Sequence, residues 1–260
     1  MTDLSTQPSS QKIALITGGS RGLGRSAALK LAERGVGVVL TYHSKQEKAE
    51  AVVREIEQHG AKAVALRLDV ARLQTFNDFM ARLDEALEAT WQRQQFDFLV
   101  NNAGFGVHSA FAETSEEDFD ALVNVHFKGV FFLTQHMLPR LADGGRIVNI
   151  STGLARFVFP GYAAYAAMKG AIEVLTRYLA KELGPRSIAV NTIAPGAVET
   201  DFGGGVVRDD EQINQYVASS TAMGRAGLPG DIGGAVASLL TGENHWVTGQ
   251  RIEVSGGQSL

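Results

Sequence analysis

Short apolar runs and longer amphipathic stretches alternate along almost the whole chain. The apolar runs are rich in Val, Ile and Leu, which is typical of strands in a sheet covered on both faces. They span Ile13–Thr17, Val36–Thr41, Ala63–Leu68, Phe98–Asn101, Arg146–Ile150, Ala189–Ile193 and Arg251–Val254. The pattern therefore predicts seven buried strands.

The stretches between these runs carry apolar residues at helical spacing, as Ile172, Leu175 and Leu179 do. The predicted helices are Gly24–Arg34, Lys45–His59, Leu73–Gln94, Ser115–Leu138, Ala163–Leu183, Asp209–Thr221 and Pro229–Leu240. This alternation predicts an α/β fold: a single-domain, doubly wound (Rossmann) seven-stranded parallel sheet with helices on both faces. We expect the domain to span residues 12–260, after a polar, disordered tail of residues 1–11.

The composition excludes several classes of protein. The chain has a formal net charge of −4 and no cysteine, so disulfides and cysteine metal sites are excluded. No basic run indicates nucleic-acid binding. The N-terminus lacks the apolar stretch of a signal peptide, and no segment approaches about 18 uninterrupted apolar residues. We expect a cytoplasmic enzyme that binds no nucleic acid, no membrane and no metal, since the histidines show no metal-ligand spacing.

The loop after the first strand is rich in glycine. Gly18, Gly22 and Gly24 have the spacing G-x-x-x-G-x-G. Glycines permit a tight turn and let backbone amides approach a pyrophosphate at a helix N-terminus. The alternative is a glycine-rich turn without a ligand. Because ligands of doubly wound sheets lie beyond the carboxyl ends of the strands, we interpret the loop as a dinucleotide site.

The end of the second strand distinguishes between the two nicotinamide cofactors. An NAD site usually has an Asp or Glu there, which binds the ribose 2′-hydroxyl, but residues 38–44 contain no acid. Arg21, Ser44 and Lys45 would offer donors and positive charge to a 2′-phosphate. We therefore expect NADP(H) to be preferred over NAD(H). The alternative is that Arg21 and Lys45 are only solvated loop charges.

Tyr165 and Lys169 stand four residues apart on the predicted helix Ala163–Leu183. Residues at this spacing share a helix face, with Cβ atoms about 5–6 Å apart. A lysine charge about 5 Å from a phenol would lower its pKa from about 10 toward about 8, where a general acid works well. The alternative is an ordinary surface pair. We interpret Tyr165 as a general acid.

Together these motifs resemble the short-chain dehydrogenase/reductase family, including its 3-oxoacyl-[acyl-carrier-protein] reductase-like members. The resemblance extends from Lys12 to Gly257, and also rests on Asn101–Gly104, on Asn124 and on Asn191–Gly196. It implies that the catalytic residues are Asn124, Thr152, Tyr165 and Lys169. It implies cofactor binding by Gly18, Ser20, Arg21, Gly22, Leu23, Gly24, His43, Ser44, Asp69, Val70, Asn102, Ala103, Gly104, Tyr165, Lys169, Pro195, Gly196, Val198 and Thr200.

One position departs from the family pattern. The catalytic serine of the family usually lies 13 residues before the tyrosine, and that residue here is Thr152. Threonine keeps the hydroxyl, although its methyl group restricts the rotamers and narrows the pocket. Ser151 is a possible substitute, but adjacent strand residues point to opposite faces. We therefore assign the role to Thr152.

The resemblance implies reduction of a ketone or 3-oxo group to a secondary alcohol. Tyr165 would donate the proton, Thr152 would orient the carbonyl oxygen, and Lys169 would lower the pKa of the tyrosine and hold the nicotinamide ribose. Asn124 would anchor a water that links Lys169 to solvent. His126 is two residues from Asn124, so on an α-helix it faces elsewhere. We interpret it as structural.

The substrate is expected between the loops Phe105–Phe111, Gly153–Tyr162 and the stretch after Thr200. Gly203–Gly205 would be a hinge for a lid over Val206–Ala222. The aromatic residues Phe105, Phe157, Phe159 and Phe202 would form an apolar pocket, or simply part of the core.

The identity of the carbonyl or alcohol substrate and the assembly are less constrained. A 3-oxoacyl carrier-protein reductase is one identity, although Arg140, Arg177 and Lys181 make only a weak basic rim. The family implies a homotetramer or homodimer. Two alternatives stay open: an NAD-dependent alcohol or sugar dehydrogenase of the same fold, and a non-catalytic regulator that senses dinucleotides.

Overall fold

The computed structural model describes residues 11–260. The predicted tail lies outside the described residues except for Gln11, which belongs to the domain. The Gln11 amide donates to Gly35 O at 2.9 Å, and its oxygen accepts a hydrogen bond from Trp91 Nε1 at 3.1 Å. The last residue of the predicted tail is therefore hydrogen-bonded to the domain.

Seven parallel strands form one sheet in the order β3-β2-β1-β4-β5-β6-β7. This confirms the predicted doubly wound architecture. Strands β1 to β3 extend the sheet to one side, and β4 to β7 extend it to the other side of β1. The strands are β1 (Ile13–Ile16), β2 (Gly37–Tyr42), β3 (Ala63–Arg67), β4 (Phe96–Asn101), β5 (Leu141–Ile150), β6 (Ala189–Pro195) and β7 (Arg251–Val254).

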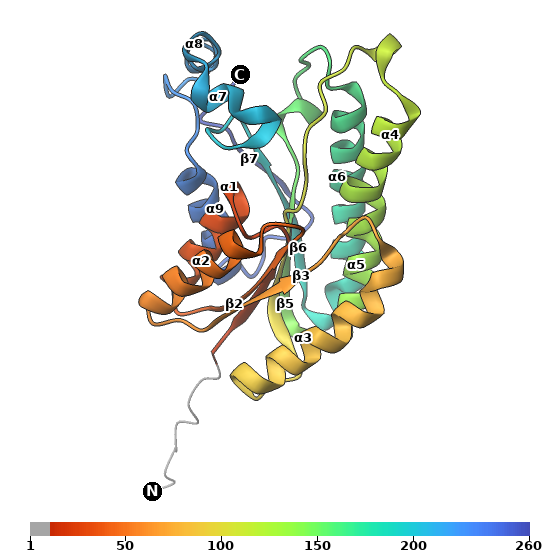
Figure 1. Cartoon of the computed structure of the whole chain (residues 1–260), viewed down its shortest axis with the longest axis vertical. Helices are drawn as coiled ribbons and strands as arrows, with labels where there is room; N and C mark the ends of the chain where they lie inside the picture. Colours follow the sequence, from red (N-terminus) through yellow and green to blue (C-terminus); the bar gives the residue numbers. More distant parts are fainter. Residues whose placement is uncertain (1–10) are drawn as a thin grey trace, which may run out of the picture.

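Helices cover both faces of the sheet (Figure 1). The α-helices are α1 (Gly22–Ala32), α2 (Gln46–Gln58), α3 (Phe76–Trp91), α4 (Glu116–Val123), α5 (Gly129–Met137), α6 (Ala163–Leu183), α7 (Val206–Asp209), α8 (Glu211–Ser219) and α9 (Pro229–Thr241). The buried residues of α1, α2 and α9 join one core cluster, and those of α3 and α5 join the other. Two separate cores on opposite faces explain why β1 and β4 are buried throughout.

The predicted helix Ser115–Leu138 is continuous along the chain but not uniform. The five residues Asn124–Lys128 form a π-helix between α4 and α5. Gly129 follows directly, and a side chain there would collide with Val70 O. A π segment shifts the rotational phase of the residues around it, so an α-helical spacing rule fails here.

The predicted helix Asp209–Thr221 is α8, which α7 precedes. Before α7 the chain turns at Gly203, Gly204 and Gly205, whose φ angles are 60°, 79° and 83°. Three consecutive left-handed residues are tolerated because glycine lacks a Cβ atom. The structure thus contains the glycine-rich turn that the lid hypothesis requires.

Candidate active site

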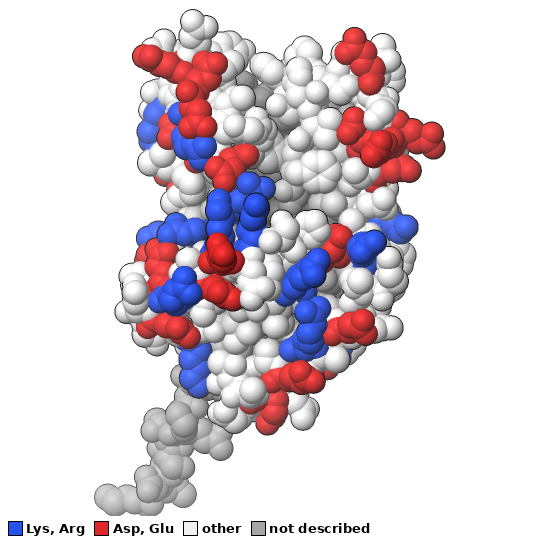
Figure 2. All heavy atoms as spheres, viewed as in Figure 1, with Lys and Arg blue, Asp and Glu red and all other residues white. Residues whose placement is uncertain are grey.

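The carboxyl ends of the strands meet in the upper half of Figure 1, and Figure 2 shows a hollow between α7–α8 and α4 on this side. The loops after β1, β4, β5 and β6 lie at this edge. Ligands of doubly wound sheets lie beyond the carboxyl ends of the strands, so this edge is where the predicted site residues should gather.

The glycine loop is shaped to leave room for a ligand. Gly18 and Gly22 have φ angles of 66° and 55°, and a Cβ atom at Gly24 would collide with Gly18 O. The side chain of Asn102 braces the loop by donating to Thr17 O at 2.9 Å and Gly18 O at 3.1 Å. The first turn of α1 contains no acidic residue, so nothing there opposes a phosphate at the positive end of the helix.

The other predicted cofactor residues of the glycine loop serve different purposes. Leu23 packs against the core and stabilises the loop from beneath. Ser20 and Arg21 line a surface hollow of about 290 Å³ between α1 and α2, together with Arg25 and Lys48. The side chain of Arg21 is 58% exposed and lies 3.4 Å from Asp201. Glu55 also lines the hollow and accepts a hydrogen bond from Arg25, so Arg21 and Lys48 are the basic side chains that it offers to an anion.

The segment after β6 meets the glycine loop from the other side. Pro195 ends the strand, and the Gly196 amide donates to Val254 O at 3.1 Å. Val198 packs against the core. Thr200 faces the glycine loop, with its Cβ 3.8 Å from where a Cβ on Gly22 would lie. The predicted sites on β1 and β6 are therefore brought together.

His43 and Asp69 also come together, across the ends of β2 and β3. His43 Nε2 lies 3.5 Å from Asp69 Oδ2, and Asp69 Oδ1 accepts a hydrogen bond from the Ala71 amide at 3.0 Å. Ser44 follows His43 and is exposed. The polar side chains on these loops, together with the glycine loop, fit a nicotinamide dinucleotide.

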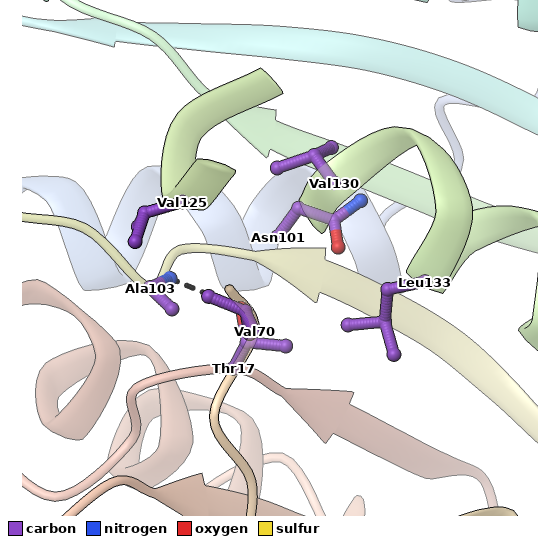
Figure 3. A pocket seen from close by; sticks show the side chains of 7 residues that line it. All are labelled: Thr17, Val70, Asn101, Ala103, Val125, Val130 and Leu133. Atoms are coloured by element: carbon purple, nitrogen blue, oxygen red, sulfur yellow. Dashed lines mark hydrogen bonds between the residues drawn. The ribbon is translucent and has the colours of Figure 1, made fainter. Parts of the chain in front are cut away.

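A small cavity lies under the turn after β4 and is unsuited to a ligand (Figure 3). It has no room for a water molecule, and its lining is mostly apolar. Thr17 Oγ1 accepts hydrogen bonds from the amides of Asn102 and Ala103 at 2.9 and 3.0 Å. The cavity residues are Thr17, Val70, Asn101, Ala103, Val125, Val130 and Leu133. Val70 and the Ala103 side chain therefore support the turn, while Gly104 next to them is exposed.

Tyr165 and Lys169 share one face of α6 and are both buried, with 6% and 5% of their surface exposed. Lys169 Nζ lies 5.8 Å from the centre of the tyrosine ring and donates to Ile150 O at 2.7 Å. The alternative of a surface pair is thus wrong. Their spacing in the sequence predicted that the two side chains lie side by side, but not that both are buried.

The predicted lowering of the Tyr165 pKa is wrong for the protein without a ligand. Burial raises the pKa of Tyr165 above its ordinary value, and a side-chain hydrogen bond with Thr152 opposes this shift without overcoming it. Burial also lowers the pKa of Lys169 to about 8. Desolvation disfavours the charged form of both groups. Tyr165 is therefore a protonated phenol at neutral pH.

Thr152 and Ser151 differ in their surroundings as predicted. Thr152 lies beside Tyr165, and its Oγ1 accepts a hydrogen bond from the Leu154 amide at 3.3 Å. Ser151 is buried, and its hydroxyl donates to Glu173 Oε1 at 2.7 Å. Arg251 bonds both Glu173 and the carbonyl of Thr152. Ser151 therefore holds the strand end in place, which leaves Thr152 as the hydroxyl near the phenol.

Asn124 begins the π-helix, and its carbonyl lies close to Gly129. His126 lies in the same segment. It contacts the site, whereas α-helical spacing from Asn124 predicted that it would face elsewhere. Its ring centre lies 5.2 Å from that of Tyr165 at an interplanar angle of 87°. The sequence offered no signal for this contact, because the spacing argument assumed an α-helix.

A cluster of aromatic side chains includes Tyr165. The ring centres of Phe202 and Tyr162 lie 5.6 and 6.4 Å from that of Tyr165, and Phe159 lies 6.1 Å from Tyr162. Phe105 contacts His126 at 5.5 Å. Phe157 is instead turned toward Gly153 and Arg156. Three of the four predicted aromatic residues thus line the site.

Two further properties concern other ligands. In residues 11–260, histidine and the acidic residues form no group of three that could hold a metal ion. Within the same described part of the chain, none of the helices is both long and apolar enough to cross a lipid bilayer.

The chain is similar over nearly its whole length to known reductases. A family model described as Enoyl-(Acyl carrier protein) reductase matches residues 18–259. Hydroxynaphthalene reductase-like protein Arp2 of Metarhizium brunneum is 38% identical over 257 residues, which cover 95% of this chain and 94% of the relative.

Solved structures agree with these relatives. The promiscuous reductase LugOII, which catalyses keto-reduction at C1 during lugdunomycin biosynthesis, has a TM-score of 0.91 at 37% identity, over 96% of this chain and 98% of its own. The angucycline C-6 ketoreductase LanV with bound NADP has a TM-score of 0.90 at 33% identity, over 95% of each chain. A further structure of LanV holds NADP and rabelomycin.

Proposed function

The chain belongs to the short-chain dehydrogenase/reductase family, and from this premise we propose that it reduces a ketone to a secondary alcohol with NADPH. The observation that carries the proposal is the buried Tyr165–Lys169 pair, with Thr152 beside the phenol and the glycine loop at the same sheet edge. Relatives that are ketoreductases by name support the direction of the reaction.

Each catalytic side chain has a distinct task. NADPH, when bound, supplies the hydride. Tyr165, which is protonated at neutral pH, donates its Oη proton to the carbonyl oxygen. Thr152 orients that oxygen through its hydroxyl. After proton transfer, the positive charge of Lys169 stabilises the tyrosinate. Asn124 anchors a water through which Tyr165 regains its proton.

For the substrate we propose a ketone on a fused aromatic ring system. The rings of Phe202 and Tyr162 beside Tyr165, and of Phe159 beside Tyr162, suit flat, apolar rings. The hydroxynaphthalene reductase-like relative and the rabelomycin complex of LanV point the same way. A carrier-protein substrate is less well supported, because Arg140 of the expected basic rim is engaged by Asp84.

The proposal is tested by following NADPH oxidation with three substrates: a bicyclic aryl ketone with a neighbouring hydroxyl, an acetoacetyl thioester and an aldose. We expect kcat/KM to be highest for the aryl ketone. A higher kcat/KM for the thioester would show that the substrate is an acyl thioester and not an aryl ketone. Failure to bind NADPH would refute the proposed function itself.

Arg21→Met is expected to weaken NADPH binding about tenfold and to leave NADH binding unchanged. The arginine lies in the basic hollow beside the glycine loop, and a charge-assisted bond to a phosphate contributes about 1.5–3 kcal/mol. Its contact with Asp201 is exposed, and exposed ion pairs contribute at most about 1 kcal/mol. Asp201 therefore does not prevent Arg21 from binding a phosphate.

Fluorescence titration with each cofactor measures this preference. Lys30→Met is the matched control because it removes a positive charge from the last turn of α1, whereas Arg21 caps the first turn. An equal loss of affinity for NADPH and NADH in Arg21→Met would show that Arg21 does not read the 2′-phosphate.

We also propose that the protein works as a homotetramer or homodimer in the cytoplasm. Exposed apolar residues lie on neighbouring helices: Phe119 on α4, Phe131 on α5, and Val174 and Tyr178 on α6. Such a surface is typical of an interface between helices. Light scattering after size exclusion should give a mass of at least two chains, and a monomer mass would contradict the assembly.

A further inference from the structure

His126 lies between the candidate proton donor and the loop that follows β4. It is only 1% exposed. One side of its ring meets Tyr165 edge to face at 5.2 Å. The other side meets the backbone of Gly104, where a Cβ atom would come within 2.5 Å of His126 Cε1. The imidazole therefore fills the space between Tyr165 and Gly104.

The hydrogen bonds of His126 fix its orientation. Nε2 lies 2.7 Å from Phe105 O and 3.3 Å from Phe105 N. These two contacts require opposite tautomers, and the shorter one assigns the proton to Nε2, which donates to the carbonyl. Nδ1 is then an acceptor, and within the described residues it is buried without a partner.

An unpaired buried nitrogen is costly to the fold, and an apolar ring of the same shape would avoid that cost. The site also keeps the imidazole neutral, since burial and the nearby charge of Lys169 lower the pKa of His126 to about 3. Because the ring stays neutral near pH 7, it does not form the imidazolium through which a histidine would relay protons from solvent. What it does supply is one directional bond to Phe105 and one shaped surface against Tyr165.

The π-helix explains how this side chain reaches the site. His126 sits in the middle of Asn124–Lys128, and π segments inside helices recur at functional sites. Gly129 lets this segment approach the loop after β3, because any side chain there would collide with Val70 O. The local backbone and the ring thus act together on the position of Tyr165.

We propose that His126 is a positioning residue for the reaction: its neutral ring holds the phenol of Tyr165 at a fixed orientation relative to Gly104 and Phe105. This inference rests on the proposed function, in which Tyr165 is the proton donor. A small displacement of a reacting group can cost about a hundredfold in rate. His126 would act through Tyr165 without touching the substrate.

Two variants separate the two contacts. His126→Phe keeps a ring against Tyr165 but loses the donor to Phe105 O, and His126→Gln keeps a donor but loses the ring. His136→Phe is the matched control, since His136 also bonds a carbonyl, that of Phe132 at 2.8 Å, and meets an aromatic ring, Phe76 at 5.7 Å. Thermal unfolding identifies any variant that fails to fold, and the other variant then carries the test.

The first readout is independent of the substrate. In protein with ¹³C-labelled tyrosine, the signal missing from Tyr165→Phe identifies Tyr165. His126→Gln should shift this signal, because the ring current of the imidazole is lost, whereas His136→Phe should leave it in place. An unmoved Tyr165 signal in both folded His126 variants would overturn the proposal, whatever substrate the enzyme uses.

The second readout is turnover on the best ketone. We expect kcat to fall about tenfold to a hundredfold in both His126 variants, with NADPH affinity within twofold of the wild type. Unchanged kcat in these variants, together with lost turnover in Tyr165→Phe, would overturn the role of His126 and leave the proposed function intact. Retained turnover in Tyr165→Phe would instead refute the proposed function.

Discussion

Tyr165→Phe will lower kcat for ketone reduction by about a thousandfold and will change NADPH affinity by less than threefold. The variant keeps the ring, which meets Phe202 and His126, and removes only the hydroxyl. General acid catalysis by a positioned side chain contributes about 10²–10⁴-fold. Because the phenol is buried, solvent cannot easily replace its proton.

Single-turnover measurements with saturating NADPH separate this effect from binding. Tyr162→Phe is the matched control, since Tyr162 lies 6.4 Å away in the same aromatic cluster but has alanine, not lysine, four residues later. We expect Tyr162→Phe to keep at least a third of the rate. If Tyr165→Phe retained a tenth of the wild-type rate, the proton donor would have to be another group.

The architecture could be predicted from the sequence because strands that are buried on both faces consist of continuous apolar runs. All seven runs are strands of the sheet, and the predicted helix Ala163–Leu183 matches α6 at both ends. The bounds of other elements were less predictable. β5 begins at Leu141, five residues earlier than predicted, because it continues through the polar stretch of Asp143 and Gly144. Leu141 pairs with Phe96 and Arg146 pairs with Phe98, so the polar residues between them form an irregularity in the strand.

The site could be predicted where it depends on topology. Thr200 and Gly22 lie far apart in the sequence, yet both follow strands whose carboxyl ends meet, and the structure brings them together. Two properties depended on packing and could not be predicted. The sequence shows the lysine charge near Tyr165 but not the depth of burial, so the direction of the pKa shift was predicted wrongly. The π-helix likewise hid the contact of His126.

Lys169→Met will abolish most turnover and stabilise the fold at neutral pH. The lysine is 5% exposed, and Ile150 O accepts its hydrogen bond. Burial lowers its pKa from 10.5 to about 8, and at about 1.4 kcal/mol per pKa unit its charge costs the fold on the order of 3 kcal/mol. Methionine removes this cost but leaves Ile150 O unpaired, so we expect a net gain of about 1–2 kcal/mol.

The pH dependence of this gain follows from the direction of the shift. Between pH 8 and 10.5 the unfolded chain binds the proton and the folded protein does not, so the stability of the wild type rises with pH across this window. The advantage of Lys169→Met should therefore be largest at pH 7, vanish near about pH 9 and become a loss of about 1 kcal/mol by about pH 10, because Ile150 O stays unpaired in the variant. Lys181→Met, at the exposed end of α6, is the control and should show no such change.

Urea unfolding at both pH values measures the stability, and single-turnover kinetics measure the loss of rate, which we expect to exceed a hundredfold. A stable but inactive variant would show that Lys169 is kept for its charge beside Tyr165 at the expense of the fold. A variant that is destabilised at pH 7 would contradict this, because the charge of Lys169 would then stabilise the folded protein.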